Sequence, residues 1–274
     1  MALRIQNNIA ALNAHRQLQI SDAGLSKSLE RLSSGYRINR AADDAAGLAI
    51  SQGMRADIAS YNVASRNVSE ANAMVQVAEG AYDQIGNMLV RLKELATQAA
   101  SANAGNDCDK IEVEAQQLLL EIDRISESTE YAGASLLSPG DLGSQTFQVG
   151  STEADSSQIE VSFSTVSTAT LNLTGLSLAD NTTAQSYLDD IDEAIDDLNT
   201  SRGTLGAIQN RLGYASANLS TTIENVQAAE SVIRDVDMAA EMTTFTKNQI
   251  LLQAGTAMLA QANMAPQVVL SLFG

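Results

Sequence analysis

The sequence has little of what most catalytic sites and disulfide-stapled folds require. Among its 274 residues there is one cysteine, Cys108, and one histidine, His15. A lone cysteine excludes an intrachain disulfide, and a lone histidine excludes the zinc and hydrolytic sites that need two imidazoles. The chain also offers no recognisable nucleophile, base or phosphate-binding loop. We therefore predict a protein that is not an enzyme and that holds no metal or cofactor.

Residues that interrupt helices are also scarce. Tryptophan is absent, aromatic residues make up 4% of the chain, and proline occurs only at Pro139 and Pro266. Ala, Gln, Asn and Ser are plentiful. This composition favours long helices over a globular core built on aromatic side chains.

Positive charge is a third shortage. Sixteen Lys and Arg stand against 33 Asp and Glu, which gives a formal net charge of -17. A nucleic-acid-binding protein needs a basic surface to neutralise phosphates, so this balance argues against nucleic acid as a partner. The stretch between Arg124 and Arg202 has 13 acidic residues and no basic one, which predicts an outer, solvated surface.

Long apolar runs are missing as well. The first residues lack the run of roughly 7–15 apolar residues of a secretory signal. No stretch approaches the roughly 20 apolar residues of a membrane span. From these signals alone we expect no membrane insertion and a default location in the cytosol.

The sequence does contain apolar residues at helical spacing. From 68 to 99 they alternate steps of three and four, which predicts a heptad seam on one long helix. The seam residues are Val68, Ala71, Val75, Ala78, Tyr82, Ile85, Leu89, Leu92, Ala96 and Ala99. A break at 103–106 precedes a second helix that starts near 107–109 and ends around 131–133. We expect the two helices to lie antiparallel.

A third long helix is predicted from about Ala184. Apolar residues recur there every seven positions, at Ile191, Leu198, Leu205, Leu212, Leu219 and Val226. A strict repeat of seven implies left-handed supercoiling against partner helices. Some 45 residues, at about 1.5 Å each, make a rod of about 65 Å.

The periodicity changes between these helices. Residues 146–149 and 158–163 alternate apolar and polar, and a polar stretch at 150–157 joins them, which predicts a β-hairpin. Residues 164–183 are rich in Ser, Thr, Leu and Asn and show no clear period. We predict that they form an exposed loop.

Both ends of the chain carry amphipathic helical patterns with little charge. After Lys247, the last 27 residues contain no ionisable side chain. A free surface helix normally displays charge, and single helices are marginal in water, so the neutral faces indicate cover by another subunit. We predict two arms that fold fully only on pairing with each other and with neighbouring copies. Their apolar stripes comprise Ile5, Ile9, Leu12, Leu18, Leu25, Leu29 and Leu32 at one end and Ile250, Leu251, Met258, Leu259, Leu270 and Leu272 at the other.

These features divide the chain into five parts. They are a first arm at 1–43, two helices and the hairpin at 44–163, the exposed loop at 164–183, a long helix at 184–231 and a second arm at 232–274. The predicted fold class is mainly α: an elongated, coiled-coil-like helical bundle with a small β-hairpin region, plus paired N- and C-terminal helices.

Three single features have competing interpretations. The acidic run Asp189–Asp197 clusters hard oxygen ligands, as calcium sites do, but it lacks the loop glycine and the terminal Glu of an EF-hand, and Ile191 and Ile195 fit a helix. A solvated first turn is therefore favoured over a calcium site. His15 has no second ligand nearby, which favours a packing or solvent role. Cys108 stands beside acids and is expected to be an inert thiol, with cross-linking between copies as the alternative.

Several longer motifs are far more specific. They include Ile5–Asn13, Leu32–Ile50, Ser65–Asn67, Arg91–Gln98, Glu121–Arg124, Leu205–Arg211, Gln249–Thr256, Ala260–Asn263 and Pro266–Leu272, of which the second begins Leu-Ser-Ser-Gly-Tyr-Arg-Ile-Asn-Arg. In these motifs the chain resembles bacterial flagellin. The likeness covers about 1–165 and 185–274.

The resemblance implies a structural subunit that polymerises into the helical flagellar filament for motility. It implies export through the flagellar type III apparatus without a cleaved signal peptide, and so an extracellular location in the flagellum. By the same resemblance, 1–43 and 232–274 form the inner core, and 44–163 and 184–231 form the outer rod layer. Residues 164–183 then stand in place of the outer domains of larger flagellins.

The resemblance also places a spoke between the two layers. Ser-Ser-Gly after a helical pattern ends that helix, with Gly35 suited to a positive-φ cap, and Asp43 and Asp44 favour the start of the next helix. The spoke residues are Ser33, Ser34, Gly35, Tyr36, Arg37, Asn39, Asp43 and Asp44. The alternative is an ordinary loop between two helices.

A further implication concerns host recognition. Arg91, Leu95 and Glu114 match the positions by which the Toll-like innate immune receptor recognises flagellins, although Lys93 replaces the family's more usual Arg nearby. Arg91 and Glu114 lie outside the predicted seams, so we expect both to point outward. The alternative is an ordinary surface ion pair.

The implied partners are many copies of the chain itself, the flagellar cap and hook-junction proteins, and the flagellin export chaperone, which would hold the C-terminal arm. The host Toll-like receptor is a further implied partner. Two alternative functions remain open: a hook-filament junction protein, and another type III secreted helical protein, which would not need the spoke motif.

Overall fold

The computed structural model describes residues 8–101, 108–138 and 144–271, and it places side chains up to residue 264. The fold is mainly α, as predicted. In chain order the elements are α1 (Ile9–Ser34), α2 (Ala45–Ala99), α3 (Cys108–Ser128), β1 (Glu130–Tyr131), β2 (Ala134–Ser135), β3 (Ser144–Gln148), a 3₁₀ turn (Asp155–Ser157), β4 (Gln158–Ser162), α4 (Asn181–Arg234) and α5 (Met238–Ser271).

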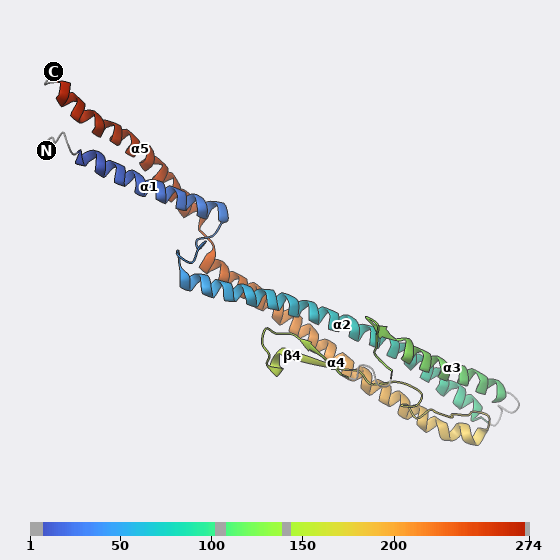
Figure 1. The fold of residues 1–274 in the computed structure, drawn as a ribbon. Helices are drawn as coiled ribbons and strands as arrows, with labels where there is room; N and C mark the ends of the chain where they lie inside the picture. Colours follow the sequence, from blue (N-terminus) through green and yellow to red (C-terminus); the bar gives the residue numbers. More distant parts are fainter. Residues whose placement is uncertain (1–7, 102–107, 139–143, 272–274) are drawn as a thin grey trace. The chain divides into compact units, whose positions relative to one another are not determined.

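The chain forms two compact units. The terminal unit comprises Met1–Ala56 and Asn225–Gly274, and the central unit comprises Asp57–Glu224. Within the terminal unit α1 lies alongside α5 (Figure 1), which brings the two ends of the sequence together. Both unit boundaries fall inside helices, namely α2 and α4.

The core of the central unit is built on the predicted seam of α2. All ten predicted seam residues are at most 2% exposed. Facing them, Ile191, Leu198, Leu205, Leu212 and Leu219 of α4 are buried too, as their seven-residue repeat predicts. Polar pairs join the two helices at Glu79–Gln209, Asp83–Arg202 and Lys93–Asp192. The residue numbers rise along α2 as they fall along α4, so the helices run antiparallel.

Helix α3 covers part of this pair with its own apolar face. Ile111, Ala115 and Ile122 are buried, and the helix ends at Ser128. A short hairpin of β1 and β2 follows, with Ala132 and Gly133 at its turn, both at positive φ. Positive φ at both turn residues is typical of a two-residue hairpin turn. The helix was predicted to end around 131–133, where this hairpin lies instead, and the two strands were not predicted.

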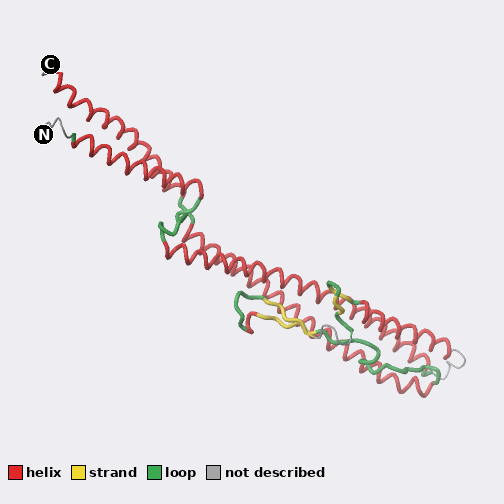
Figure 2. The backbone as a smooth tube through the Cα atoms, viewed as in Figure 1, coloured by secondary structure: helices red, strands yellow, loops and turns green. Residues whose placement is uncertain are grey.

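The predicted hairpin is confirmed by strands β3 and β4. They pair antiparallel with Phe147 opposite Ile159 (Figure 2), and the intervening residues contain the 3₁₀ turn. Along β4, Ile159 and Val161 are buried and Glu160 is exposed. The alternation of apolar and polar residues therefore correctly predicts which face of this strand is buried.

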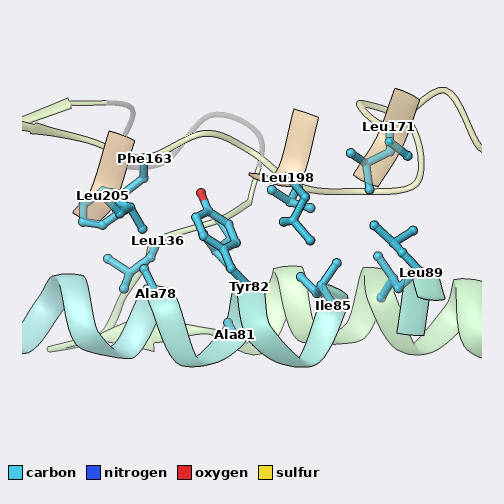
Figure 3. Packing of buried hydrophobic residues seen from close by; sticks show 14 of the residues in the cluster. Ala78, Ala81, Tyr82, Ile85, Leu89, Leu136, Phe163, Leu171, Leu198 and Leu205 are labelled. Carbon is cyan, nitrogen blue, oxygen red and sulfur yellow. The ribbon is translucent and has the colours of Figure 1, made fainter. Parts of the chain in front are cut away.

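Residues 164–183 were predicted to form an exposed loop, and the burial of their apolar side chains contradicts the exposed part of that prediction. Residues 164–180 have no helix or strand and 181–183 begin α4, but the apolar side chains of the segment reach the core of the central unit. The buried residues are Val166, Leu171, Leu173, Leu176 and Leu178. Figure 3 shows Leu171 close to Leu89 and Leu198. The segment has no period because it follows turns, with Asn172 and Gly175 at positive φ, so its leucines are directed by tertiary contacts rather than by a repeat.

Polar contacts hold this segment against the helices. Tyr82 donates its hydroxyl hydrogen to the carbonyl of Ser164 at 2.6 Å, and burial raises the pKa of Tyr82 to about 12. Asp123 of α3 accepts hydrogen bonds from both the amide and the hydroxyl of Thr168, at 2.8 and 2.7 Å. Gln116 donates to the carbonyl of Leu176 at 2.7 Å. The backbone of an irregular segment thus finds partners inside the fold.

Candidate functional site

The paired terminal helices form a heptad seam of their own. Every third or fourth residue of α1 and α5 is buried or half-buried, while the residues between them are mostly exposed. The seam consists of Ala11, Ala14, Leu18, Ser21, Leu25, Ser28 and Leu32 on α1 and Glu241, Phe245, Asn248, Leu252, Gly255, Leu259 and Ala262 on α5. The pairing is antiparallel, because Asn8 donates to the carbonyl of Ala262 while Arg31 contacts Glu241 at 3.4 Å.

This seam is thinly filled. Between Asn8 and Ser34, and between Met238 and Met264, the only buried residues are Ser21, Ser28 and Glu241. Small residues bring the helices close: a Cβ added at Gly24 would lie 2.9 Å from Asn248, and one added at Gly255 would lie 3.2 Å from Leu18. A two-helix contact with no fully buried apolar side chain contributes little stability by itself.

The predicted arm residues divide between two faces. Leu18, Leu25, Leu32 and Leu259 lie in the seam and are half-buried. The others that have described side chains lie outside it and are between 40% and 66% exposed: Ile9, Leu12, Leu29, Ile250, Leu251 and Met258. Ile5 and Leu272 fall outside the described residues, and the side chain of Leu270 is not described either. Each terminal helix therefore carries apolar side chains that its partner helix does not cover.

The uncovered side chains of α5 border a shallow groove. Its lining includes Met242, Ile250 and Leu251, together with Thr246 and the single cation Lys247. Met238 and Met264 are also about half exposed on the same helix. A monomeric protein rarely exposes so much apolar surface on one helix, so this face indicates an interaction site.

The predicted spoke connects α1 to α2 through a tight set of local caps. Gly35 ends α1 at φ 76°, and its amide donates to the carbonyl of Arg31 at 2.8 Å. Asp44 accepts a hydrogen bond from the amide of Gly47 at 2.9 Å and so caps the start of α2. The predicted positive-φ cap at Gly35 is confirmed, and α2 begins directly after Asp44, as predicted. Ser33 and Ser34 form the exposed end of α1.

Asp43 is the electrostatic centre of this turn. Its carboxylate contacts Lys27 at 2.8 Å and accepts hydrogen bonds from the amides of Arg40 and Asn39 at 3.2 and 3.3 Å. The hydrogen bond from Lys27 and those two amides lower the pKa of Asp43 to about 2. Asp43 therefore holds the turn against α1 as a charged group.

The same turn also contacts the end of α4 and the residue that follows it. Tyr36 forms an antiparallel bridge with Asp235, and the guanidinium of Arg234 lies 4.2 Å from the centre of the Tyr36 ring. Arg37 donates from its side chain to the carbonyl of Ile233 at 2.6 Å. Tyr36 and Arg37 were predicted to belong to the spoke, but their partners were not predicted, because no local signal connects residues almost 200 positions apart.

The proposed receptor residues lie on α2 and α3 of the central unit. Arg91 contacts Glu114 and Glu94, both at 2.8 Å, and these carboxylates raise the pKa of Arg91. Arg91 and Glu114 point outward, each with 48% of its side chain exposed. Leu95 is only 2% exposed and faces the core. In this conformation Leu95 supports the helix beneath the pair and offers no surface of its own.

The acidic run, His15 and Cys108 are not arranged as a binding or catalytic site among the described residues. Among the described residues no group of three or more His, Cys, Asp or Glu side chains could hold a metal ion. The acidic run belongs to α4, where Asp192 pairs with Lys93, and His15 is exposed on α1. Cys108 is a buried free thiol. No helix in the described part of the chain combines the length and apolar character that crossing a bilayer requires.

Comparison with known families finds two matching models that together span most of the chain. Residues 5–141 match the bacterial flagellin N-terminal helical region, and residues 188–273 match the bacterial flagellin C-terminal helical region. The span between the two matches contains β3, β4 and all of the segment 164–183.

Curated proteins and solved structures agree with these matches. Flagellin of Halalkalibacterium halodurans is 44% identical over 269 residues, which cover 98% of both chains. Flagellin of Bacillus subtilis is 41% identical and covers 98% of this chain and 99% of its own. The crystal structure of Bacillus cereus flagellin shares 30% identity with a TM-score of 0.50, covering 60% of this chain and 94% of that one.

Proposed function

Because the chain belongs to the bacterial flagellin family, we propose that it is a structural subunit that polymerises into the flagellar filament and so serves motility. Membership of this family makes it a structural protein and not an enzyme. The observation that carries the proposal is the uncovered apolar surface of the paired terminal helices. Ile9 and Leu12 of α1, and Ile250 and Met258 of α5, are more than half exposed although they belong to amphipathic helices.

Polymerisation gives this surface a partner. Burying apolar area contributes about 25 cal/mol per Å², and much of that gain offsets the ordering of the helices and the loss of rigid-body freedom. A contact between different surfaces of identical copies that does not close produces a helical polymer. A single contact between two copies does not offset these costs, so each copy must contact several neighbours. Assembly is therefore cooperative.

Electron microscopy of the purified protein after salt-induced polymerisation tests this function. We expect long helical filaments from the full chain. Deleting 1–40 or 235–274 should leave a helical protein, by circular dichroism, that forms none. Filaments from either truncation, or a full chain that stays monomeric under all conditions, would contradict the proposal.

In the assembled filament we propose that 1–43 and 232–274 form the inner core and that 44–163 and 184–231 form the outer rod layer. The spoke at 33–44 connects the two, and 164–183 occupies the position where larger flagellins carry outer domains. Density maps of the filament test this assignment directly. Helices 9–34 and 238–271 must then line the inner wall, and the assignment fails if they lie on the outside.

We further propose that the protein is exported unfolded through the flagellar type III apparatus, without a cleaved signal peptide, and acts outside the cell. The export chaperone would shield the apolar strip of the C-terminal arm, and the cap and hook-junction proteins would contact the growing and the anchored filament ends. Mass spectrometry of sheared filaments tests the export step. Subunits that lack more than the initiator Met1 at the N-terminus would refute export without cleavage.

The exposed pair of Arg91 and Glu114 supports a role for the rod layer as a ligand of the Toll-like innate immune receptor. Both side chains are accessible and held in a fixed geometry. A receptor reporter assay on monomeric Arg91→Ala decides the point: an unchanged signal would eliminate this assignment. Buried Leu95 acts here by holding α2 in place, so Leu95→Ala should reduce both the signal and the stability of the protein.

A second candidate function is the hook-filament junction protein. The observation in its favour is a fold likeness to a putative flagellar hook-associated protein from Vibrio parahaemolyticus, with a TM-score of 0.58 at 10% identity. At that identity the likeness concerns the fold alone. Immunogold labelling separates the two functions, because a filament subunit is labelled along the whole filament and a junction protein only at its base.

A further inference from the structure

Backbone hydrogen bonds join two segments that are far apart in the sequence: the turn between α1 and α2, and the linker between α4 and α5. The amide of Arg37 donates to the carbonyl of Arg234 at 2.7 Å, and the amide of Val236 donates to the carbonyl of Gly35 at 3.0 Å. These two bonds flank the antiparallel bridge between Tyr36 and Asp235. All of these residues belong to the terminal unit.

Side chains close over this backbone contact from both segments. The guanidinium of Arg234 lies 4.2 Å from the Tyr36 ring centre, within the range of a cation–π interaction. The Arg234 side chain is only 13% exposed and lies 3.7 Å from Glu230. Nε of Arg234 has no hydrogen-bond partner in the described structure, so the face of the Tyr36 ring is a main contact of this charge.

Ion pairs also connect the turn that makes this contact to α1. Asp43 ties the turn to Lys27, and Arg40 reaches back to Glu30 at 2.9 Å. Ile38 of the same turn is the only apolar side chain of the described terminal unit that is buried. The turn therefore has a fixed position relative to α1. Through Arg37 it also fixes the end of α4, and through Val236 it fixes the linker that leads into α5.

The seam between α1 and α5 does not define its own register strongly. Its residues repeat every seven positions, and many are small or polar, such as Ser21, Ser28 and Gly255. A repeat of this kind offers similar contacts after a slip of one heptad, because register is specified by distinctive side chains at the interface. Arg31 with Glu241 is one such distinctive pair, with Glu241 buried, but its two charged groups lie 3.4 Å apart, at the long end of the hydrogen-bond range.

We propose that Tyr36 and Arg234 form a registration latch that sets the alignment of α1 against α5 within one chain. The latch presents the two uncovered apolar faces as one defined surface to a second copy, and to this extent the inference rests on the proposed function. Tyr36 and Arg234 are positioning residues: they act through the alignment of the helices rather than by contacting the second copy.

Hydrogen exchange of the full-length monomer, followed by mass spectrometry, tests the latch. In the wild type, the amides of Arg37 and Val236 should exchange more slowly than the exposed turns of the same unit. Tyr36→Leu removes the ring face and should speed exchange at both amides and along α1 and α5 by about fivefold, as expected for a cation–π contact of ordinary strength. Tyr36→Phe keeps the ring and should exchange as the wild type does.

A matched pair of arginine variants controls for loss of charge. Arg234→Gln should reproduce the effect of Tyr36→Leu. Arg211→Gln, on the same helix but at an exposed arginine without a hydrogen bond or ion pair among the described residues, should leave exchange unchanged. Equal exchange in Tyr36→Leu and Tyr36→Phe would overturn the latch, and so would fast exchange of Arg37 and Val236 in the wild type.

Filament assembly separates this inference from the function on which it rests. If the wild type forms filaments and the two Tyr36 variants exchange alike, the latch fails and the filament function stands. If the wild type forms no filaments, the filament function fails whatever the exchange rates are. If both hold, Tyr36→Leu should elongate filament seeds more slowly than Tyr36→Phe at equal concentration, and equal elongation rates would again overturn the latch.

Discussion

The terminal and central units share the same helical periodicity, but it builds a buried core only in the central unit. Of the buried apolar residues in the described part of the chain, all except Ile38 belong to the central unit. There α2, α3, α4 and the segment after β4 complete a core within one chain. The terminal unit pairs α1 with α5 through half-buried leucines and small residues and leaves its other apolar side chains exposed. A heptad pattern therefore identifies a helix interface but does not tell whether the partner is in the same molecule.

The two units also differ in what fixes their geometry. The central unit is ordered by apolar burial, which resists unfolding in any isolated copy. The terminal unit is ordered by charged and backbone contacts in the turn between α1 and α2 and at the end of α4, around Asp43 and Arg234. Its paired helices lack a core. The stability of such a unit depends on a binding partner and hence on protein concentration. Substitutions in the two units should therefore be detected by different measurements.

The largest expected effect is a core truncation in the central unit. Leu89→Ala removes a fully buried side chain from the α2 seam and should lower the free energy of unfolding by about 3 kcal/mol. Urea denaturation of the monomer measures this. Val90→Ala, at the neighbouring residue with 52% exposure, is the matched control and should change the free energy by less than about 0.5 kcal/mol.

The same truncation in the terminal unit should have a different signature. Ile250→Ala removes an exposed side chain and should leave the monomer's unfolding unchanged, while raising the protein concentration needed for filament growth. A large loss of monomer stability in Ile250→Ala would contradict the absence of a core in the described terminal helices. It would mean that α5 has a core of its own that the side-chain exposures do not reveal.

The next effect concerns the segment whose burial the sequence did not predict. Asp123→Asn leaves one carbonyl oxygen for the two donors of Thr168, which now bond a carboxylate at 2.7–2.8 Å, and should cost about 2 kcal/mol. Glu121→Gln, which weakens an exposed pair with Arg124, is the control and should cost much less. Limited proteolysis should then cleave within 164–178 in Asp123→Asn before it cleaves the helices. Resistance equal to the control would show that leucine packing alone holds the segment.

The helices of the central unit could be predicted because each is governed by a local repeat. The spacing of Val68 to Ala99 determines which face of α2 is apolar, and the structure buries that face. The hairpin β3–β4 followed in the same way from a period of two. The segment at 164–183 could not be placed, because Leu173 and Leu176 are directed by turns and by contacts with α3 and α4.

At the candidate site the sequence identified the helices but not how their faces are divided. Leu18 and Leu12 belong to one predicted stripe, yet the first lies in the seam and the second is exposed. The distinction depends on where α5 lies, which a stripe on α1 alone does not encode. The Tyr36–Arg234 contact was missed for a related reason: its partners are neither periodic nor close in sequence.

A pH titration tests the ion pair and hydrogen bonds of Asp43 in the turn between α1 and α2. Asp43 has its pKa lowered from 3.8 to about 2, so its contribution to stability is fully present above about pH 4 and is lost as the pH falls through about 2. NMR titration of the Asn39 and Arg40 amides should show this loss. Asp43→Asn should remove it, and Asp22→Asn, at an exposed carboxylate of α1 without a hydrogen bond or ion pair among the described residues, should not. A midpoint near 4 in the wild type would mean that the turn is open in solution.

The smallest expected effect is at the surface of the central unit. Arg91 and Glu114 are both about half exposed, and ion pairs of that kind contribute between zero and about 1 kcal/mol, because solvent screens them and ordering two long side chains opposes the gain. Arg91→Ala should therefore leave the urea midpoint nearly unchanged. If the receptor reporter signal falls in this variant while the midpoint holds, the loss must come from the missing guanidinium and not from unfolding. A clear fall in the midpoint would contradict the division made between core and surface, because an exposed pair would then be stabilising the central unit as its buried leucines do.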